Sequence, residues 1–225
     1  LITAVLLLSH VVIMQSRALL VLACGFLFTA CIIVPHLLTF PGAFSEAGLF
    51  GGQLGTSAWL YGLWHLAVQS AAIAYAQMRN RLNLPPIAAE AVRSTILLYG
   101  AATVLLVIAM TCVVISAGRL LPDFLVDEFR LNGDVAHGVT LVVVAVSAVA
   151  IFAVGRGRGR HSTIDTWLMV VIAAWVVEII LLASSETRFS VAWYVGRLIG
   201  LIASSMMLAL LIVAGSFLQY AQGQR

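Results

Sequence analysis

Residues 95–118 read TILLYGAATVLLVIAMTCVVISAG and contain no charged side chain. A helix of about 20 such residues crosses the roughly 30 Å hydrocarbon layer of a membrane. Similar apolar runs fill most of the 225-residue chain, which is 62% hydrophobic and only 9% charged. A soluble domain usually has about 25% charged residues. The sequence therefore predicts an integral membrane protein.

Seven apolar segments follow one another along the chain, separated by short connectors that contain proline, glycine or Asn-Gly breakers. They cover residues 1–13, 17–40, 57–78, 95–118, 136–155, 165–184 and 190–218. This pattern predicts an all-α fold, a polytopic transmembrane bundle of seven helices. The first segment begins inside an apolar run at Leu1, so we expect the chain to be truncated at its N-terminus.

Arginine is distributed unevenly between the two sets of alternate connectors. One set, with the C-terminus, contains eight arginines: Arg17, Arg79, Arg81, Arg93, Arg156, Arg158, Arg160 and Arg225. The other set contains Arg119, Arg130 and Arg188. Positively charged connectors are retained in the cytoplasm, so we expect a cytoplasmic C-terminus. Residues 1–218 would form a single transmembrane domain, and residues 219–225 would extend the long last helix into the cytoplasm toward an output domain absent from this chain.

Four ionisable side chains fall inside apolar segments, where charge is costly and usually functional. They are His36, His65, Glu178 and Arg197. A rise of 1.5 Å per residue places all four in the same half of the membrane. Glu178 and Arg197 have opposite charges on neighbouring segments, so we expect them to pair. Such a pair would either fix helix register or form part of a ligand or ion pocket.

The two histidines have three interpretations. His36 and His65 would suit a pair of metal or haem ligands, a hydrogen-bonded packing role, or a pH-sensitive or ligand-contacting site. No Cys-x-x-Cys-His or His-Glu-x-x-His motif accompanies them. The sequence therefore assigns no metal site and identifies no cofactor.

Aromatic residues gather at the same end of the segments, either as an interfacial belt or as a cleft for an apolar or aromatic molecule. Such a cleft would be lined by Trp64, Trp193 and Tyr194, with the glycine-rich residues 42–55 as its lid. Gly196 and Gly200 form a Gly-x-x-x-Gly motif, which would allow close helix approach or a homodimer.

Catalysis is not expected of this chain. It shows no nucleophile with an accompanying base and acid and no glycine-rich phosphate loop, so we assign no catalytic residue. The arginine-rich residues 156–160 fit a topological anchor or a contact with anionic lipid better than a nucleic-acid site. The lipid bilayer is the expected partner, and no nucleic acid is.

Three strings resemble the bacterial membrane-associated sensor family of the fourth type. They are VPHLLTFPGAF at 34–44, AWLYGLWH at 58–65 and ETRFSVAWYVGR at 186–197. The resemblance covers most of the chain and implies a sensory input domain in the bacterial inner membrane, fused to a cytoplasmic diguanylate cyclase or histidine kinase. The family pattern has eight spans, which implies that one span precedes Leu1.

Together these features predict a membrane sensor in which an unknown stimulus at the polar layer shifts the last helix. The residues expected to sense it are His36, His65, Glu178, Arg197, Trp64, Trp193 and Tyr194. Two alternatives are a transporter or channel, and a haem- or metal-bearing membrane protein.

Overall fold

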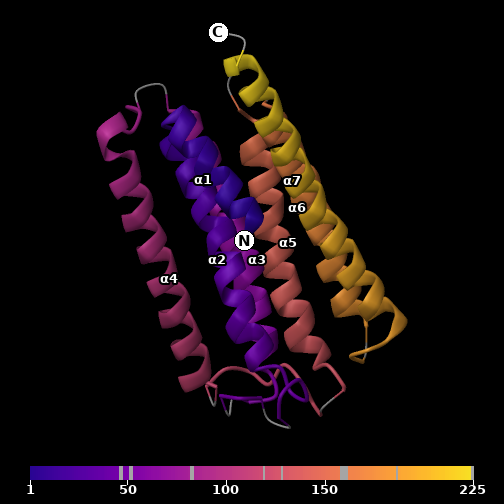
Figure 1. Ribbon diagram of the computed structural model, residues 1–225. Helices are drawn as coiled ribbons and strands as arrows, with labels where there is room; N and C mark the ends of the chain where they lie inside the picture. Colours follow the sequence, from indigo (N-terminus) through magenta and orange to yellow (C-terminus); the bar gives the residue numbers. More distant parts are fainter. Residues whose placement is uncertain are drawn as a thin grey trace.

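Seven α-helices make up most of the described part of the chain in the computed structural model (Figure 1). The structure describes residues 1–45, 48–50, 53–81, 84–118, 120–127, 129–157, 162–185 and 187–223, with side chains through Val213. The helices are α1 (Ile2–Met14), α2 (Arg17–Leu38), α3 (Thr56–Arg79), α4 (Val92–Ser116), α5 (Gly133–Gly155), α6 (Thr163–Ser184) and α7 (Val191–Gly223), and a 3-10 turn, Ala89–Ala91, precedes α4. The predicted all-α bundle is confirmed, and every helix end lies within five residues of its predicted position.

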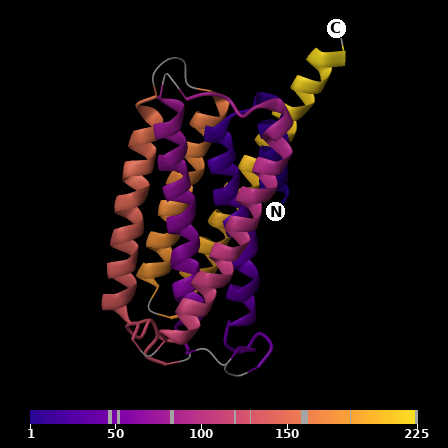
Figure 2. The same ribbon diagram turned by 90° about the vertical axis from the view of Figure 1, so that its left-hand side faces the viewer.

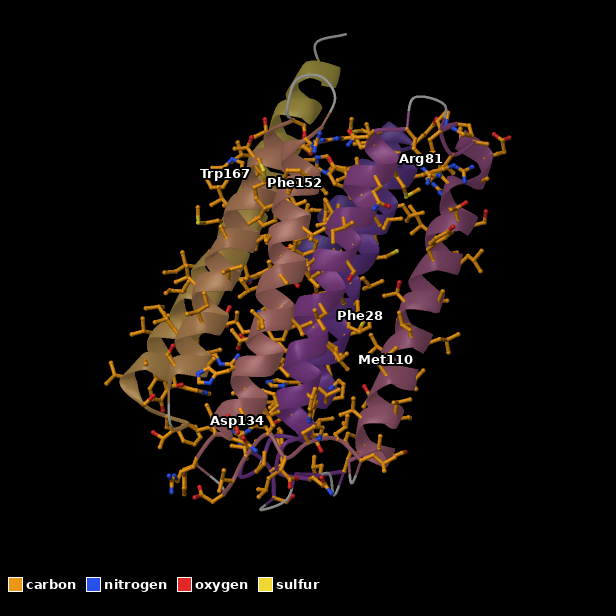
Figure 3. All side chains as sticks on the ribbon, turned by 180° about the vertical axis from the view of Figure 1, so that it is seen from behind. Phe28, Arg81, Met110, Asp134, Phe152 and Trp167 are labelled. Carbon is orange, nitrogen blue, oxygen red and sulfur yellow. The ribbon has the colours of Figure 1, made fainter. Side chains whose placement is uncertain are left out.

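The two ends of the bundle differ in their arginine content. The Arg-poor end comprises the connectors 39–55, 117–132 and 185–190, and the Arg-rich end comprises the connectors 15–16, 80–91 and 156–162 and the C-terminus. Figure 3 shows Asp134 at the first end and Arg81 at the second. Four of the connector arginines counted from the sequence lie outside the described residues: Arg119, Arg158, Arg160 and Arg225.

Helix α3 has the most polar sequence of the long helices and occupies the most interior position. Five helices of the described chain are long and apolar enough to cross a membrane, namely α2, α4 with its 3-10 turn, α5, α6 and α7 through Val213. The apolar helix α1 is shorter, whereas α3 is long enough but carries the buried polar side chains Tyr61, His65, Gln69 and Tyr75. Because α3 packs against α2, α4, α5 and α6, its polar face meets protein rather than lipid.

The outer faces of the other helices are apolar. Large exposed side chains include Leu97 and Leu105 on α4, Leu141 on α5, and Leu198 and Leu201 on α7. In water these would form extended apolar patches, which soluble monomers rarely expose. In a bilayer they face lipid, so the chain is a multi-pass membrane protein.

A buried ion pair joins α3 to α6 at the Arg-rich end. Asp165 is completely buried, forms an ion pair with Arg79 and accepts a hydrogen bond of 2.8 Å from the Tyr75 hydroxyl. Its second oxygen accepts a hydrogen bond from the Ser162 backbone N–H, which completes the capping box that starts α6. Arg79 also donates to the Val154 carbonyl of α5. One carboxylate therefore fixes three helices at this end.

Replacing Asp165 with Asn should destabilise the bundle, because it leaves Arg79 without its counter-ion. Removing one partner of a fully buried pair costs about 3–5 kcal/mol. Since the Arg79 side chain is 23% exposed and stays partly hydrated, we expect a loss of about 2 kcal/mol. Thermal unfolding in detergent measures this loss. Asp134→Asn, at the exposed start of α5, is the control, and equal unfolding temperatures for the two variants would contradict the prediction.

Candidate functional site

Tyr61 on α3 is the residue around which the predicted polar side chains meet. Its hydroxyl donates a 2.7 Å hydrogen bond to Glu178 Oε1, and the guanidinium carbon of Arg197 lies 4.2 Å from the centre of its ring. The rings of His65 and His36 lie 4.4 and 6.1 Å from the same ring. The structure thus brings four predicted residues from four helices together around a fifth that the sequence analysis did not select.

Glu178 is buried on α6 and faces a cation on α7. Its Oε1 lies 3.8 Å from Arg197 Nη1, so the predicted pairing of these two residues is confirmed. Its Oε2 lies 3.9 Å from His65 Nε2. With the Tyr61 bond, each oxygen of this buried carboxylate has a polar neighbour, as a charge in hydrocarbon requires.

Gly200 allows α7 to lie directly against that carboxylate. A Cβ atom at this position would come within 2.6 Å of Glu178 Oε1, so a larger residue here would displace the Glu178 carboxylate from its present partners. One turn earlier, a Cβ at Gly196 would lie 3.3 Å from the Glu178 carbonyl oxygen and 3.2 Å from Leu182. The Gly-x-x-x-Gly motif therefore packs α7 against α6 of the same chain, which is the close approach that the sequence predicted. This face of α7 is occupied and is not free for a homodimer.

Both histidines use one ring nitrogen within the bundle. His36 Nδ1 donates to the Ser57 carbonyl at 2.8 Å, and His65 Nδ1 donates to the Tyr61 carbonyl at 3.0 Å. Because a carbonyl oxygen only accepts, each Nδ1 must carry the proton. This arrangement matches the hydrogen-bonded interpretation of the histidines. Among the described residues, no three His, Cys, Asp or Glu side chains are grouped as metal ligands would be.

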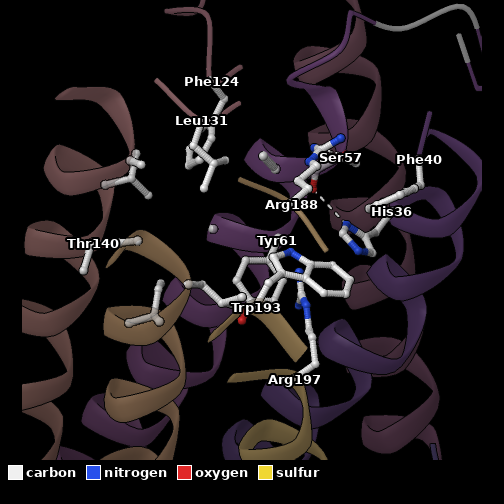
Figure 4. Close-up of a pocket in the computed structure, with 17 residues that line it drawn as sticks. His36, Phe40, Ser57, Tyr61, Phe124, Leu131, Thr140, Arg188, Trp193 and Arg197 are labelled. Carbon is white, nitrogen blue, oxygen red and sulfur yellow. Dashed lines mark hydrogen bonds between the residues drawn. The ribbon is translucent and has the colours of Figure 1, made fainter. Parts of the chain in front are cut away.

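A cavity of about 70 Å³ lies next to Tyr61 at the Arg-poor end of the bundle (Figure 4). We call this cavity the Arg-poor pocket. This volume is well above the roughly 10–15 Å³ that one water needs. The lining residues that have polar side-chain atoms are His36, Ser57, Tyr61, Thr140, Arg188, Trp193 and Arg197. Its apolar wall includes Phe124, Leu131, Val139, Ile179 and Leu182. A concave space lined by apolar and aromatic groups together with polar side chains is typical of a small-molecule site.

The sequence-predicted residues divide into three groups by position. His36, Trp193 and Arg197 line the pocket. Glu178 and His65 do not line it and contact its lining residue Tyr61 instead. Trp64 and Tyr194 were expected in the lining and are not in it.

Their positions explain this difference. Trp64 stacks on His65 with 5.4 Å between ring centres. Tyr194 is 56% exposed and packs beside Trp193 and Phe189. A position near the end of an apolar segment does not say which way the ring points, since neighbouring residues on a helix face different directions.

The glycine-rich connector is not the cover of the pocket in the described part of the chain. Phe44 and Phe50 of this connector are more than half exposed, and none of its described residues between 42 and 55 lines the pocket. Phe124 and Leu131 line it instead, from the connector between α4 and α5. The sequence showed aromatic and glycine content but not which of the two connectors folds inward.

Arg188 is a second pocket residue, after Tyr61, that was not selected from the sequence. It lies in the connector between α6 and α7, yet its side chain is 8% exposed. Its Nη2 donates to Ser57 Oγ at 3.5 Å, and its guanidinium carbon lies 5.0 Å from the centre of the Phe40 ring. Burial, with the positive charge of Arg197 nearby, lowers the pKa of Arg188 to about 10. Connector arginines usually anchor topology, so only the fold reveals this one as a pocket residue.

Residues 1–219 match the family model MASE4, described as "Membrane-associated sensor, integral membrane domain". No curated protein and no solved structure matches the chain.

Replacing Gly200 with Ala should destabilise the protein, because the added methyl group overlaps the Glu178 carboxylate and separates α7 from α6. Overpacking of this kind costs about 1–3 kcal/mol, measured by thermal unfolding of the purified protein. Gly138→Ala on α5 is the matched control, since nothing lies within 4 Å of a Cβ placed there. Equal unfolding temperatures for the two variants would contradict the close approach of Gly200 to the Glu178 carboxylate.

A double-mutant cycle should show coupling between Glu178 and Arg197. Glu178→Gln leaves Arg197 uncompensated, and Arg197→Gln leaves Glu178 uncompensated, so each single variant should lose stability. The double variant should lose less than the sum of the two, by about 0.5–3 kcal/mol. Additive losses would show that the two side chains do not interact.

Proposed function

The chain belongs to the MASE4 family of membrane-associated sensor domains, and we propose that it is the input domain of a bacterial signalling protein. The stimulus is a small molecule bound in the Arg-poor pocket. The output is a cytoplasmic diguanylate cyclase or histidine kinase domain that follows α7. The membrane domain itself senses and carries no catalytic residue.

The observation that supports this proposal is that helix α7 both lines the pocket and extends well beyond it. Trp193 and Arg197 line the pocket from the first two turns of α7. The same helix continues to Gly223, about 50 Å at 1.5 Å per residue, and projects past the other helices (Figure 2). A helix of this length exceeds the roughly 30 Å hydrocarbon layer and can transmit a displacement across it.

The resting position of α7 depends on an ion pair that a ligand can compete with. Arg197 lies between Glu178 and the pocket, so a ligand that attracts Arg197 weakens its hold on α6. A ligand shifts an equilibrium only by its difference in affinity for the two states. Competition for Arg197 supplies such a difference.

We assign the predicted residues three roles. His36, Trp193 and Arg197 contact the ligand. Glu178 and His65 hold Arg197 and Tyr61 in position, and Trp64 supports His65 by stacking. Tyr194 belongs to the interfacial aromatic belt, where Tyr and Trp are enriched.

The proposed orientation places the Arg-poor end outside the inner membrane and the C-terminus in the cytoplasm. It is supported by the uneven arginine content of the connectors, eight against three. Residues 1–218 then form the transmembrane sensor, and residues 219–225 lead to the output domain. Any pairing of two copies would use the exposed face of α7, which includes Val195, Leu198 and Ile202.

Replacing Tyr61 with Phe should shift the output of a chimera in which residues 1–225 are fused to a diguanylate cyclase domain. The change removes only the hydroxyl that donates to Glu178 and so alters the balance between the two positions of α7. Allosteric coupling is typically about 1–3 kcal/mol, so we expect a change in basal cyclic di-GMP synthesis of about 5-fold or more in membranes.

Tyr194→Phe is the control for this experiment, because Tyr194 is exposed and outside the pocket. It should leave cyclic dinucleotide synthesis within about two-fold of the parent chimera, on equal amounts of membrane protein. Equal synthesis by the two variants would argue against a sensory role for the Tyr61 cluster. Solute flux into proteoliposomes that contain the chain would instead support the transporter alternative.

A further inference from the structure

Arg188 is a buried cation for which no described carboxylate serves as a counter-ion. Its polar contact is with a serine hydroxyl, and its flat face lies against Phe40. The ion pairs among the described residues involve Arg79 and Arg197, not Arg188, and Glu186 lies outside those residues. A buried charge is normally paired, so this guanidinium is available to an anion that enters the pocket.

Among the described residues, the charges around the pocket sum to one positive charge. Arg188 and Arg197 line it, and Glu178 offsets one of the two from below. His36 needs only its Nδ1 proton for the bond to Ser57, so a neutral ring suffices there. A ligand with a single negative charge would therefore leave the buried site neutral, whereas a dianion would reverse its charge.

The apolar part of the pocket lining determines which kind of molecule can carry the negative charge into the pocket. Leu131, Val139, Ile179 and Leu182 contribute apolar side chains to the lining, together with the rings of Phe124 and Trp193. An inorganic anion would lose its hydration against these groups without replacing it, since transfer of an ion out of water is costly. An apolar body attached to one anionic group fits both parts of the wall.

We propose that the Arg-poor pocket binds a small monocarboxylate, with the carboxylate at Arg188 and Arg197 and the apolar body against α5 and α6. The planar guanidinium group is suited to this partner, because its N–H groups match the two oxygens of a carboxylate. The assignment rests on the proposed sensory function and specifies the class of its stimulus.

Binding of benzoate to the purified chain in lipid nanodiscs tests the assignment. Benzamide has the same shape without the charge, and inorganic phosphate has the charge without the apolar body. Isothermal titration should show saturable benzoate binding that is at least about 10-fold tighter than that of benzamide, as expected for a charge-assisted bond. Phosphate should neither bind nor displace benzoate.

Variants at Arg188 locate the bound carboxylate. Arg188→Gln should weaken benzoate binding at least about 10-fold and remove the preference over benzamide. Arg188→Lys keeps the charge without the planar fork and should give an intermediate affinity, which preserves the test if the glutamine variant does not fold. Arg130→Gln, at an exposed residue of the same end, should bind benzoate like the parent chain.

Each of the following results would overturn the proposal: no saturable benzoate binding up to about 10 mM; equal binding of benzamide; or parent-like binding by both Arg188 variants. Displacement of benzoate by phosphate would do so as well, in favour of an inorganic anion site. The chimera experiment with Tyr61→Phe uses no ligand. A response there without benzoate binding would reject the ligand class alone, and benzoate binding without a response would reject the sensory role alone.

Discussion

The arrangement of the bundle depends on one constraint: the Glu178 carboxylate is buried among apolar helices and must be paired. An unpaired charge at this depth costs a few kcal/mol, comparable to much of the stability of a typical protein. Tyr61, Arg197 and Gly200 together meet the requirement, by a hydrogen bond, by a cation and by the absence of a side chain. These residues come from α3 and α7, so satisfying one side chain of α6 sets the position of three helices.

The same combination of tyrosine, carboxylate and arginine recurs at the Arg-rich end as Tyr75, Asp165 and Arg79. The two tyrosines of α3 are 14 residues apart, about 21 Å, and the two carboxylates of α6 are 13 apart, about 20 Å. With matched polar links at both ends, α3 and α6 form a fixed frame.

Helix α7 is linked to that frame by an ion pair at the Arg-poor end, whereas near the other end Met207 and Leu211 join an apolar cluster. Apolar contacts are not directional, so α7 is the element of the three that can move.

Sequence reasoning was reliable where the physics is local. Hydropathy located seven helices because a helix that crosses lipid must be apolar, although only five of them are both long and apolar enough to cross a membrane in the described chain. The cost of buried charge singled out Glu178 and Arg197 as a pair. Sequence reasoning missed Tyr61, because this residue is no more polar than the aromatic residues around it. It missed Arg188 because contacts with distant residues fold the connector of Arg188 inward. It also missed Asp165, which at the start of a helix resembles an ordinary N-terminal acid until α3 is seen to cover it. In each case the missing information is a contact between residues far apart in the sequence.

The position of Arg197 links ligand binding to the position of α7 in both directions. The guanidinium lies over the rings of Tyr61 and Trp193 and within ion-pair distance of Glu178, so any anion in the pocket competes with α6 for the same cation. Thermodynamic linkage makes this coupling reciprocal: if ligand binding shifts the equilibrium of α7 toward one position by a given factor, that position binds the ligand more tightly by the same factor. A tenfold preference corresponds to about 1.4 kcal/mol, less than the worth of one good charge-assisted hydrogen bond. A single shared arginine is therefore sufficient, in energy, to connect a pocket at one face of the membrane with a helix end at the other.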